Sequence, residues 1–332
     1  MIIVEVVGGL GNQMFDYLFY LALKERRGDV RITDYWFSHS VYKGAASHAQ
    51  KYLLADIFAL NSAEYADDKS TKKIGDVSWS TLSKVRRRIF GLQKKTFWDE
   101  RDLVRTKNIA ELHSPIRHIK RVLGLSKTNA LGFNSSTLVM KHVSEILDKN
   151  ENAFFSGYWQ DFAYAQDIED KVRQEFTFKK PLDERNQVIA NQMVDETEVS
   201  VSIHVRRGDY LLAKNSHFAR ISEGYYERAM NYFTDRFSSE NVHFYVFSND
   251  ITWCRENLKT TKITFIDWNT GDDSYRDMQL MSLCKHNIIA NSSFSTWGAW
   301  LNANPSKIVI RPKFFSVNGA PPIPTDWIVM DN

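Results

Sequence analysis

A cluster of charged side chains follows an apolar stretch in the second half of the chain. Residues 199–203 have the pattern of a buried strand. The residues that could do chemistry come directly after it: His204, Arg206, Arg207 and Asp209. Ligands of open α/β sheets bind beyond the carboxyl ends of strands, and paired arginine donors there suit a diphosphate. The sequence therefore predicts an anion site, and the alternative is a surface salt bridge that involves Asp209.

Length and composition are typical of a globular protein with more than one hydrophobic core. The chain has 332 residues, of which 43% are hydrophobic and 25% charged, so about two domains are expected. The two cysteines, Cys254 and Cys284, imply no disulfide framework and fit a reducing compartment. The apolar run 2–7 is too short for a signal peptide or a membrane span. We expect a cytoplasmic protein.

The positive charge of the chain is concentrated in one segment. Residues 69–127 hold 16 Lys and Arg against 5 Asp and Glu, a balance of +11, whereas the whole chain carries +3. The rest of the chain is therefore at −8. A basic segment on an acidic protein favours an anionic surface as partner, and we expect peripheral contact with the inner face of a membrane. The alternative is a solvated helix face; no nucleic-acid module accompanies the segment, so no nucleic-acid partner is predicted.

The first residues predict a strand, a glycine loop, a helix and a second strand, at 2–7, 8–13, 14–27 and 30–33. Such a βαβ opening lets the backbone approach a ligand at the start of the helix. Met14 stands where a dinucleotide-binding loop has its third glycine, and the lysine of a phosphate-binding loop is absent. This disfavours a nicotinamide oxidoreductase, and the alternative for the loop is a tight strand-to-helix turn.

The second half alternates short apolar strands with helices, which predicts a parallel sheet. The expected strands are 199–204, 242–247, 262–266, 287–290 and 307–310, and the expected helices are 223–237, 252–258, 273–285 and 297–302. Asp250 and the hydroxyls of Ser293, Ser295 and Thr296 follow two of these strands. Hydroxyls at a helix start either cap its free amides or share them with phosphate oxygens, and we favour the second role.

Five motifs together resemble a known family. In order they are Gly8-Gly9-Leu10-Gly11-Asn12-Gln13-Met14-Phe15, Gly157-Tyr158-Trp159-Gln160, His204-Val205-Arg206-Arg207-Gly208-Asp209-Tyr210, Phe247-Ser248-Asn249-Asp250, and Ser292-Ser293-Phe294-Ser295-x-Trp297-Gly298-Ala299-Trp300-Leu301. This order resembles glycosyltransferase family 11, the α-1,2-fucosyltransferases, over residues 1 to about 312. Asp16 departs from the family pattern, which usually has glutamine there.

The resemblance implies an α/β protein of the GT-B type, with two Rossmann-like domains facing a cleft. Residues 1–155 would form the acceptor-side domain with a basic insertion at about 60–130. Residues 156–332 would bind the GDP-sugar, and the tail after residue 312 is expected to pack back on the first domain.

The resemblance also implies the reaction, an inverting transfer of L-fucose from GDP-β-L-fucose to the 2-hydroxyl of a terminal β-galactoside. The acceptor is expected to be lipid-linked. The implied catalytic residues are Arg206, Arg207 and Asp209; the donor-binding residues are Asn12, His204, Asp250, Asp277, Ser293, Ser295 and Thr296; the acceptor-binding residues are Asp16, Tyr158, Trp159 and Glu223. From the residues themselves, Tyr158 and Trp159 could stack on a sugar or belong to a core. The general base stays open among Asp209, Glu223, Asp16 and Asp250.

The sequence predicts that no metal cofactor is used. Many nucleotide-sugar transferases hold a metal with two aspartates spaced i, i+2, and this chain has no such pair and no H-E-x-x-H motif. The arginines would then stabilise the charge of the leaving GDP. Two alternatives remain: a transferase of the same fold that uses another GDP-6-deoxyhexose or makes another linkage, and a non-catalytic protein that binds sugar nucleotides or glycans.

Overall fold

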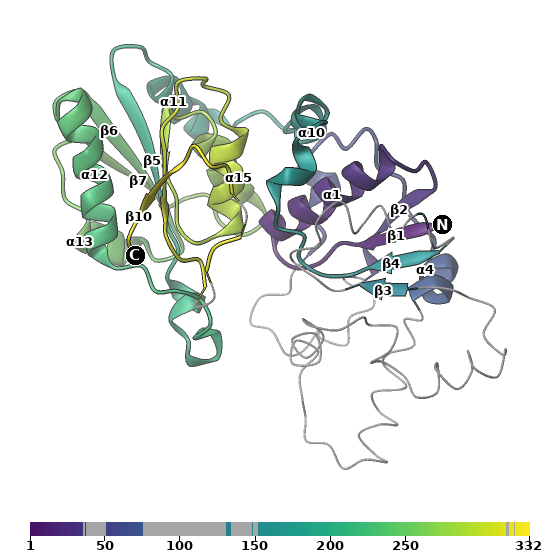
Figure 1. Ribbon diagram of the computed structural model, residues 1–332. Coiled ribbons are helices and arrows are strands. Elements are labelled where there is room, and N and C mark those ends of the chain that lie inside the picture. Colours follow the sequence, from purple (N-terminus) through teal and green to yellow (C-terminus); the bar gives the residue numbers. More distant parts are fainter. Residues whose placement is uncertain are drawn as a thin grey trace. The chain divides into compact units, whose positions relative to one another are not determined.

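The computed structural model describes residues 1–35, 37, 51–75, 131–133, 148, 152–316, 319–321 and 323–332. The chain forms two compact units, Met1–Thr177 and Phe178–Asn332 (Figure 1). Most of the basic segment 69–127 lies outside the described residues. The two α/β units predicted from the sequence are confirmed, while the cleft between them stays a prediction.

The division between the units falls after Thr177, later than the boundary at 155/156 that the sequence suggested. The intervening residues stay with the first unit because their side chains pack into it. The Phe162 ring lies edge-on to Phe15 with 4.9 Å between ring centroids, and the Tyr17 hydroxyl donates to a Glu175 carboxylate oxygen at 2.8 Å.

The first unit is built on a parallel sheet of four strands in the order β2-β1-β4-β3. Its elements are β1 (Ile2–Glu5), α1 (Leu10–Lys24), β2 (Val30–Thr33), α3 (Leu54–Ile57), α4 (Asp68–Gly75), β3 (Leu131–Phe133), β4 (Ala153–Phe155), the 3₁₀ turn η1 (Phe162–Ala165) and α10 (Glu169–Glu175). Helix α1 begins at Leu10, four residues before the expected start, because Gly9 serves as its N-cap and Gly8 turns the chain with φ +78°. Thirteen residues of α1 are buried, so this helix is central to the unit.

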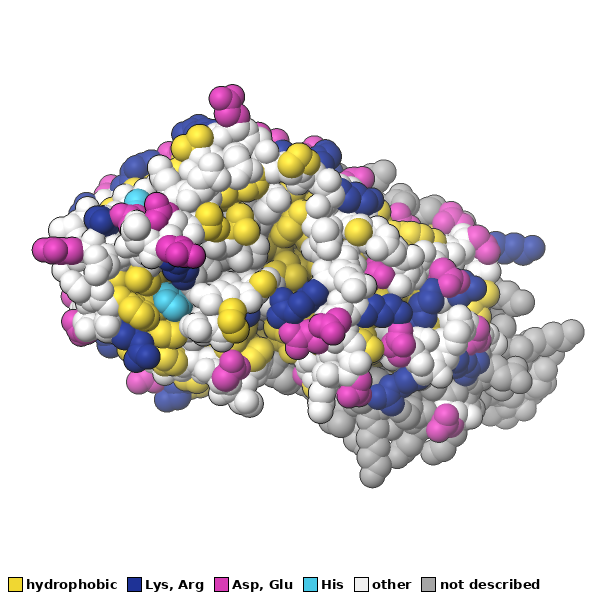
Figure 2. Space-filling model, turned by 90° about the horizontal axis from the view of Figure 1, so that it is seen from above, with side chains coloured by type: hydrophobic (Ala, Val, Ile, Leu, Met, Phe, Trp, Pro, Cys, Tyr) yellow, Lys and Arg dark blue, Asp and Glu magenta, His cyan; other side chains and the backbone are white. Residues whose placement is uncertain are grey.

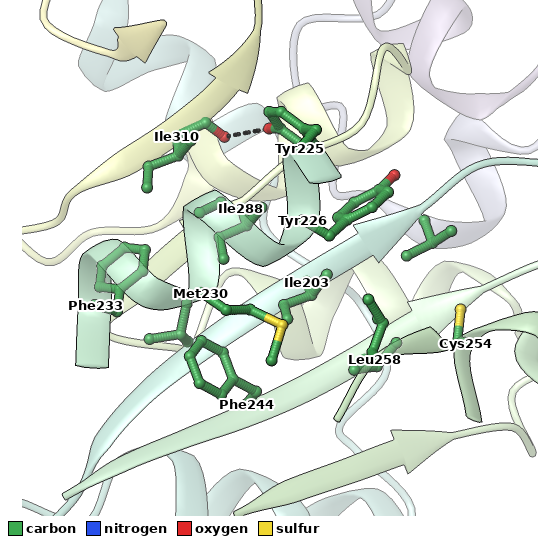
Figure 3. Packing of buried hydrophobic residues seen from close by; sticks show 14 of the residues in the cluster. Ile203, Tyr225, Tyr226, Met230, Phe233, Phe244, Cys254, Leu258, Ile288 and Ile310 are labelled. Atoms are coloured by element: carbon green, nitrogen blue, oxygen red, sulfur yellow. Dashed lines mark hydrogen bonds between the residues drawn. The ribbon is translucent and has the colours of Figure 1, made fainter. Parts of the chain in front are cut away.

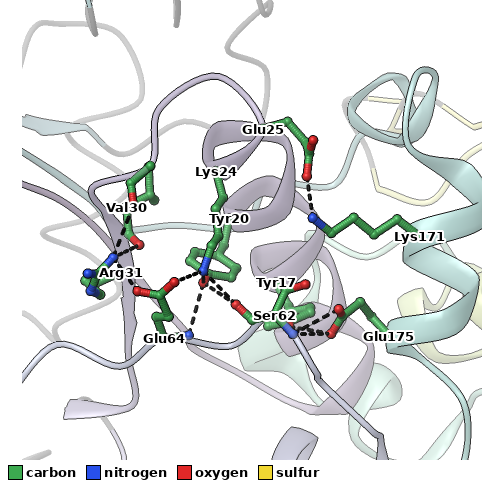
Figure 4. A network of polar contacts seen from close by, with 11 residues as sticks. Tyr17, Tyr20, Lys24, Glu25, Val30, Arg31, Ser62, Glu64, Lys171 and Glu175 are labelled. Atoms are coloured by element: carbon green, nitrogen blue, oxygen red, sulfur yellow. Dashed lines mark hydrogen bonds and ion pairs between the residues drawn. The ribbon is translucent and has the colours of Figure 1, made fainter.

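A polar network ties α1 to the segment that follows α3 (Figure 4). The Tyr20 hydroxyl and the Lys24 ammonium both donate to the Ser62 carbonyl oxygen, at 2.7 and 2.9 Å. The Ser62 N–H in turn donates to Glu175 at 2.9 Å, and Lys24 pairs with Glu64. These bonds satisfy polar groups that the apolar helix would otherwise leave unpaired on burial.

The second unit is built on a parallel sheet of six strands in the order β10-β9-β8-β5-β6-β7. Its strands are β5 (Val199–Val205), β6 (Val242–Ser248), β7 (Ile263–Ile266), β8 (His286–Ile288), β9 (Val309–Pro312) and β10 (Ile328–Met330). Its helices are α11 (Glu184–Met193), α12 (Glu223–Phe237), α13 (Ile251–Asn257), α14 (Tyr275–Met281) and α15 (Ser293–Leu301), with 3₁₀ turns η2 (Gly208–Leu211), η3 (Ala213–Asn215) and η4 (Gly271–Asp273).

Apolar side chains cover both faces of this second sheet. On one face, Met230 and Phe233 of α12 belong to the same cluster as Ile203 and Phe244 (Figure 3). On the other face, Tyr245 and its neighbours pack with α11 and α14. Burial on both sides explains why the strands are apolar runs without alternation.

The C-terminal tail completes the second sheet. Strand β10 pairs in parallel with β9, from Ile328 opposite Ile310 to Met330 opposite Pro312. The backbone hydrogen bonds of this strand are made to β9, and the expectation that the tail packs back on the first unit stays a prediction. Among the helices that the structure describes, none has the length and apolar composition that a membrane span requires.

Candidate active site

The order of the second sheet reverses between β5 and β8. From β5 the chain continues to β6 and β7 on one side, and then returns to β8, β9 and β10 on the other. In open parallel sheets, ligands bind outside the carboxyl ends of the strands at this switch point. The three segments singled out by the sequence follow β5, β6 and β8, and the fold therefore brings them to one edge of the sheet.

The two arginines leave β5 with separate carboxylate partners. Arg206 Nη2 contacts both carboxylate oxygens of Asp209, at 2.8 and 3.0 Å. Arg207 Nε contacts Asp250 Oδ2 at 3.3 Å, and the Arg207 guanidinium lies 4.1 Å from the ring centroid of Trp253. The two arginine side chains remain 33% and 23% exposed, respectively. Each guanidinium is thus oriented by the protein and still accessible to an anion.

His204 precedes the arginines as a buried, neutral imidazole. Burial, and to a smaller extent the charge of Arg206, lowers the pKa of His204 to about 3. Its Nδ1 atom is buried and has no hydrogen-bond partner among the described residues. An unsatisfied polar atom in a buried side chain is costly unless a ligand completes it, which fits the predicted donor contact.

Helix α15 begins at Ser293, four residues before the expected start at 297. Ser295 and Thr296 are buried, and their hydroxyls donate to the Ser292 carbonyl oxygen at 3.3 and 2.9 Å. Their hydrogens are thus unavailable to a phosphate in this state, a correction to the role predicted for both. The first turn of α15 has no side-chain cap, so its backbone N–H groups and Ser293 are the remaining donors.

Asp277, in the first turn of α14, sits in a chain of amides. The Asn269 side chain donates to Asp277 at 2.9 Å and exchanges hydrogen bonds with Asn186 at 2.8 and 3.1 Å. Burial raises the pKa of the Asp277 carboxyl to about 7, although the Asn269 hydrogen bond acts in the opposite direction. Near neutral pH this group can therefore change from hydrogen-bond donor to acceptor.

Two predicted acceptor contacts in the first unit are wrong. Asp16 is fully buried and its Oδ2 accepts the Val7 N–H at 2.9 Å, so it serves the backbone. Trp159 is also fully buried and stacks on Phe19, with 4.1 Å between ring centroids and 11° between planes. Neither side chain can contact a bound sugar, because no surface of it is exposed.

The remaining residues predicted in the first unit lie around the glycine loop. A Cβ on Gly8 would stand 2.8 Å from a ring carbon of Tyr158, so Tyr158 closes against the loop. Asn12 accepts a hydrogen bond from Gln160 Nε2 at 2.7 Å. Both side chains are partly exposed at the start of α1, and contact with substrate remains a prediction for both.

Glu223 lies on the exposed side of α12. It lines a groove of about 390 Å³ together with Glu227, Asn231 and Glu256, between α12 and the end of α13. No contact joins it to the arginines or their carboxylates among the described residues. This placement does not support Glu223 as an acceptor contact or general base, because its neighbours belong to the helix layer.

Asn249 and Gly208 also belong to this site, although no role was predicted for either residue. The Asn249 side chain accepts the Arg207 N–H at 3.0 Å and donates to Asp209 Oδ1 at 3.4 Å. A Cβ on Gly208 would lie only 2.4 Å from Asn249 Nδ2. The signals in the sequence are that Asn249 lies two residues after a predicted strand and that both residues belong to the quoted family motifs.

Charged side chains of both signs are mixed on the surface of the described residues. In the view of Figure 2, acidic and basic side chains are interspersed on the visible face. Among the described residues, no three or more His, Cys, Asp or Glu side chains are grouped closely enough to hold a metal ion.

A parallel α/β unit with oriented arginines, and with a buried imidazole whose Nδ1 has no partner among the described residues, has at its switch point the features that suit a phosphate-bearing ligand. The family model described as "Glycosyl transferase family 11" matches residues 105–317. The chain belongs to this family, and the family predicted from its motifs is confirmed.

Curated relatives agree with this assignment. The chain is 30% identical over 97% of both sequences to the Escherichia coli O-antigen biosynthesis glycosyltransferase WbnK. It is 36% identical to the E. coli alpha-1,2-colitosyltransferase over 52% of this chain and 61% of the relative. It is 30% identical to human galactoside alpha-(1,2)-fucosyltransferase 1 over 44% of this chain and 42% of the relative. The last two matches cover less than two thirds of the relative's length.

Proposed function

We propose that the protein transfers L-fucose from GDP-β-L-fucose to the 2-hydroxyl of a terminal β-galactoside, forming an α-1,2 linkage with inversion and without a metal ion. The observation that carries this proposal is the pair of oriented arginines at the switch point of a family 11 chain. The partial match to an alpha-(1,2)-fucosyltransferase supports the sugar and the linkage.

In the proposed reaction, the acceptor oxygen attacks the anomeric carbon from the face opposite GDP. The bond from that carbon to the phosphate oxygen breaks, and GDP leaves with the electron pair. Negative charge therefore grows on the diphosphate as the bond opens, and donors fixed in place beforehand stabilise it most effectively. Arg206 and Arg207 fill this role because Asp209 and Asp250 already hold them.

The proton of the acceptor hydroxyl needs a destination, and none of the four candidate carboxylates fits well. Asp16 is buried against the backbone, and Glu223 faces the groove beside α12. Asp209 and Asp250 are engaged by arginines, which favours an orienting role for both. We therefore propose that bond breaking to GDP dominates the barrier and that the acceptor proton is lost late, to solvent water.

The donor nucleoside is assigned to His204 and Asp277. A neutral imidazole with an unpaired Nδ1 can hydrogen-bond a ribose or base without adding charge. An ionised Asp277 would accept from the N1–H and amino group of guanine, both of which are donors. The uncapped start of α15 is proposed to bind phosphate oxygens.

A second donor is favoured by one specific comparison. The relative with 36% identity is an alpha-1,2-colitosyltransferase, so a GDP-linked colitosyl donor is the alternative with the same fold and linkage. The acceptor is proposed to be a lipid-linked glycan, because the relative that matches over its whole length acts in O-antigen biosynthesis.

The first experiment incubates the purified protein with GDP-fucose, EDTA and a panel of β-galactosides, and determines product linkage by NMR. An α-1,2-linked fucose formed at an undiminished rate in EDTA supports donor, linkage and metal independence together. Activity restored only by a divalent cation contradicts the last of these. Transfer from a GDP-colitosyl donor alone supports the alternative, and GDP binding without any transfer favours a non-catalytic binding protein.

A further inference from the structure

One side-chain amide connects the two arginines of the site. The paired residues of β5 and β6 end at Val205 opposite Ser248. Beyond this pair, Ser248 Oγ donates to the Val205 carbonyl at 2.9 Å, and Asn249 Oδ1 accepts the Arg207 N–H at 3.0 Å. The side chains of Ser248 and Asn249 thus hydrogen-bond to the β5 main chain beyond the last paired residues of the two strands. The bond from Asn249 holds the main chain of Arg207.

The Nδ2 end of the Asn249 amide is connected to Arg206 through the carboxylate of Asp209. Asn249 Nδ2 donates to Asp209 Oδ1 at 3.4 Å, and Asp209 makes two contacts with Arg206. Only a side chain with an acceptor and a donor on one planar group can make both connections. Aspartate would keep the acceptor but would place a second negative charge beside Asp209.

Gly208 makes room for this arrangement. Its backbone is not in the left-handed region, so conformation alone does not require glycine there. The requirement comes from space, because a Cβ would lie 2.4 Å from Asn249 Nδ2. Alanine at this position would move the Asn249 amide, a flexible end, while the backbone could stay unchanged.

We propose that Asn249 is a positioning residue, whose amide sets the Arg207 main chain and the Arg206–Asp209 pair for the anionic leaving group. This inference rests on the proposed function, since it assigns the arginines to the diphosphate. Asn249 acts through the arginines and touches no reacting atom. A misplacement of about 1 Å in such a group is enough for a rate loss of about 10²-fold.

The test compares Asn249→Ala, Asn249→Asp and Gly208→Ala with wild type. The matched controls are Asn231→Asp, the same charge change at an exposed site on α12, and Gly28→Ala, where no atom lies within 4 Å of the added Cβ. We expect kcat for fucosyl transfer to fall by about tenfold to a hundredfold in the three variants, and by less than twofold in the controls.

Three further measurements separate positioning from general damage: the melting temperature, and calorimetric affinities for guanosine and for inorganic pyrophosphate. The proposal predicts weaker pyrophosphate binding, with guanosine affinity and melting temperature like those of the controls. It is overturned if Asn249→Ala and Gly208→Ala keep both kcat and pyrophosphate affinity within twofold of wild type. Loss of guanosine affinity together with a lowered melting temperature also overturns it, since that pattern is structural damage.

The pyrophosphate arm also separates this inference from the proposed function. If wild type binds pyrophosphate but transfers no fucose, the donor assignment fails, and a weaker affinity in Asn249→Ala still supports the positioning role. If wild type binds neither pyrophosphate nor GDP, the anion site itself is absent and both proposals are overturned.

Discussion

The two units belong to the same class but differ in the order of their strands and in what lies at the strand ends. Each is a parallel α/β unit, and in each the order of the described strands reverses beside the first strand, at β1 and β4 in one and at β5 and β8 in the other. In the first unit, Gln13 donates to the Gly8 and Lys51 carbonyls and accepts the Leu53 N–H. In the second unit, the arginines stay partly exposed and His204 Nδ1 has no partner among the described residues.

The comparison shows that a switch point supplies only the location of a ligand site. Charged and hydrogen-bonding side chains without a full set of protein partners supply the binding. Several polar groups near β1 hold the first unit together, as Asp16 does for the Val7 N–H, although Trp159 Nε1 is buried without a hydrogen-bond partner among the described residues. Polar groups near β5 are oriented but not saturated. The sharpest tests therefore change one group on each side of the comparison.

The largest effect is expected from Trp159→Ala in the first unit. The indole is fully buried and stacks on Phe19, so its removal should cost about 3–5 kcal/mol of unfolding free energy. Chemical denaturation measures this loss. Trp159→Phe is the matched control, because it keeps a ring against Phe19 and should cost much less. A Trp159→Ala protein with unchanged stability and a raised acceptor KM would restore the sugar-stacking role.

The next largest effect is expected from Arg207→Ala in the second unit. We expect turnover to fall by at least about 10²-fold, the scale for losing one donor that stabilises developing charge. The melting temperature should change little, because the side chain is partly exposed. Arg255→Ala is the control, since Arg255 is half exposed, pairs with Asp267 at 2.7 Å and lies 4.8 Å from the ring centroid of Phe265. Near wild-type turnover in Arg207→Ala would remove this residue from the mechanism.

The smallest effect concerns the pH dependence of nucleoside binding through Asp277. Its pKa of about 7 means that it ionises between pH 6 and pH 8, and only the carboxylate can accept from both guanine donors. Guanosine affinity should therefore rise about tenfold over this range in calorimetry, following the ionised fraction. Asp277→Asn should abolish the rise, and a wild-type affinity that is flat with pH would contradict the contact.

Ionisation of Asp277 is expected to favour nucleoside binding but to lower the stability of the free protein. Its folded pKa is raised from 3.8 to about 7, so the unfolded chain loses this proton first as pH rises. The contribution of Asp277 to stability is therefore present below about pH 4 and lost as pH rises to about 7. Asp277→Asn should flatten this part of the stability profile.

Much of the second unit could be predicted from its sequence because each element has a local signature. The expected helix 223–237 matches α12, and the expected strands match β5 to β9 within two residues at either end. The ends of helices were harder to predict where backbone atoms decide the position of the end. Helices α1 and α15 both begin four residues early, since their first turns contain glycine or serine in place of the apolar pattern.

The placement of the predicted residues agrees with the structure where charge decided it and differs where burial did, and the roles of the residues stay predictions. Arg206, Arg207 and Asp209 are at the strand end that the sequence indicated. Asp16 and Trp159 were misplaced because α1 and its neighbours are buried on nearly all sides, so no polar face shows which side chains reach solvent. The strand β10 was missed because three residues carry too little periodicity.

The sequence by itself determined the family, the parallel α/β class of the second unit and the residue types at its strand ends, since these depend on local pattern and motif order. Only the tertiary structure decided which carboxylate holds which arginine and that Asn249 joins them. The physical reason is register: the pairing of Val205 with Ser248 brings Arg207 and Asn249, 42 positions apart in the chain, within hydrogen-bond distance.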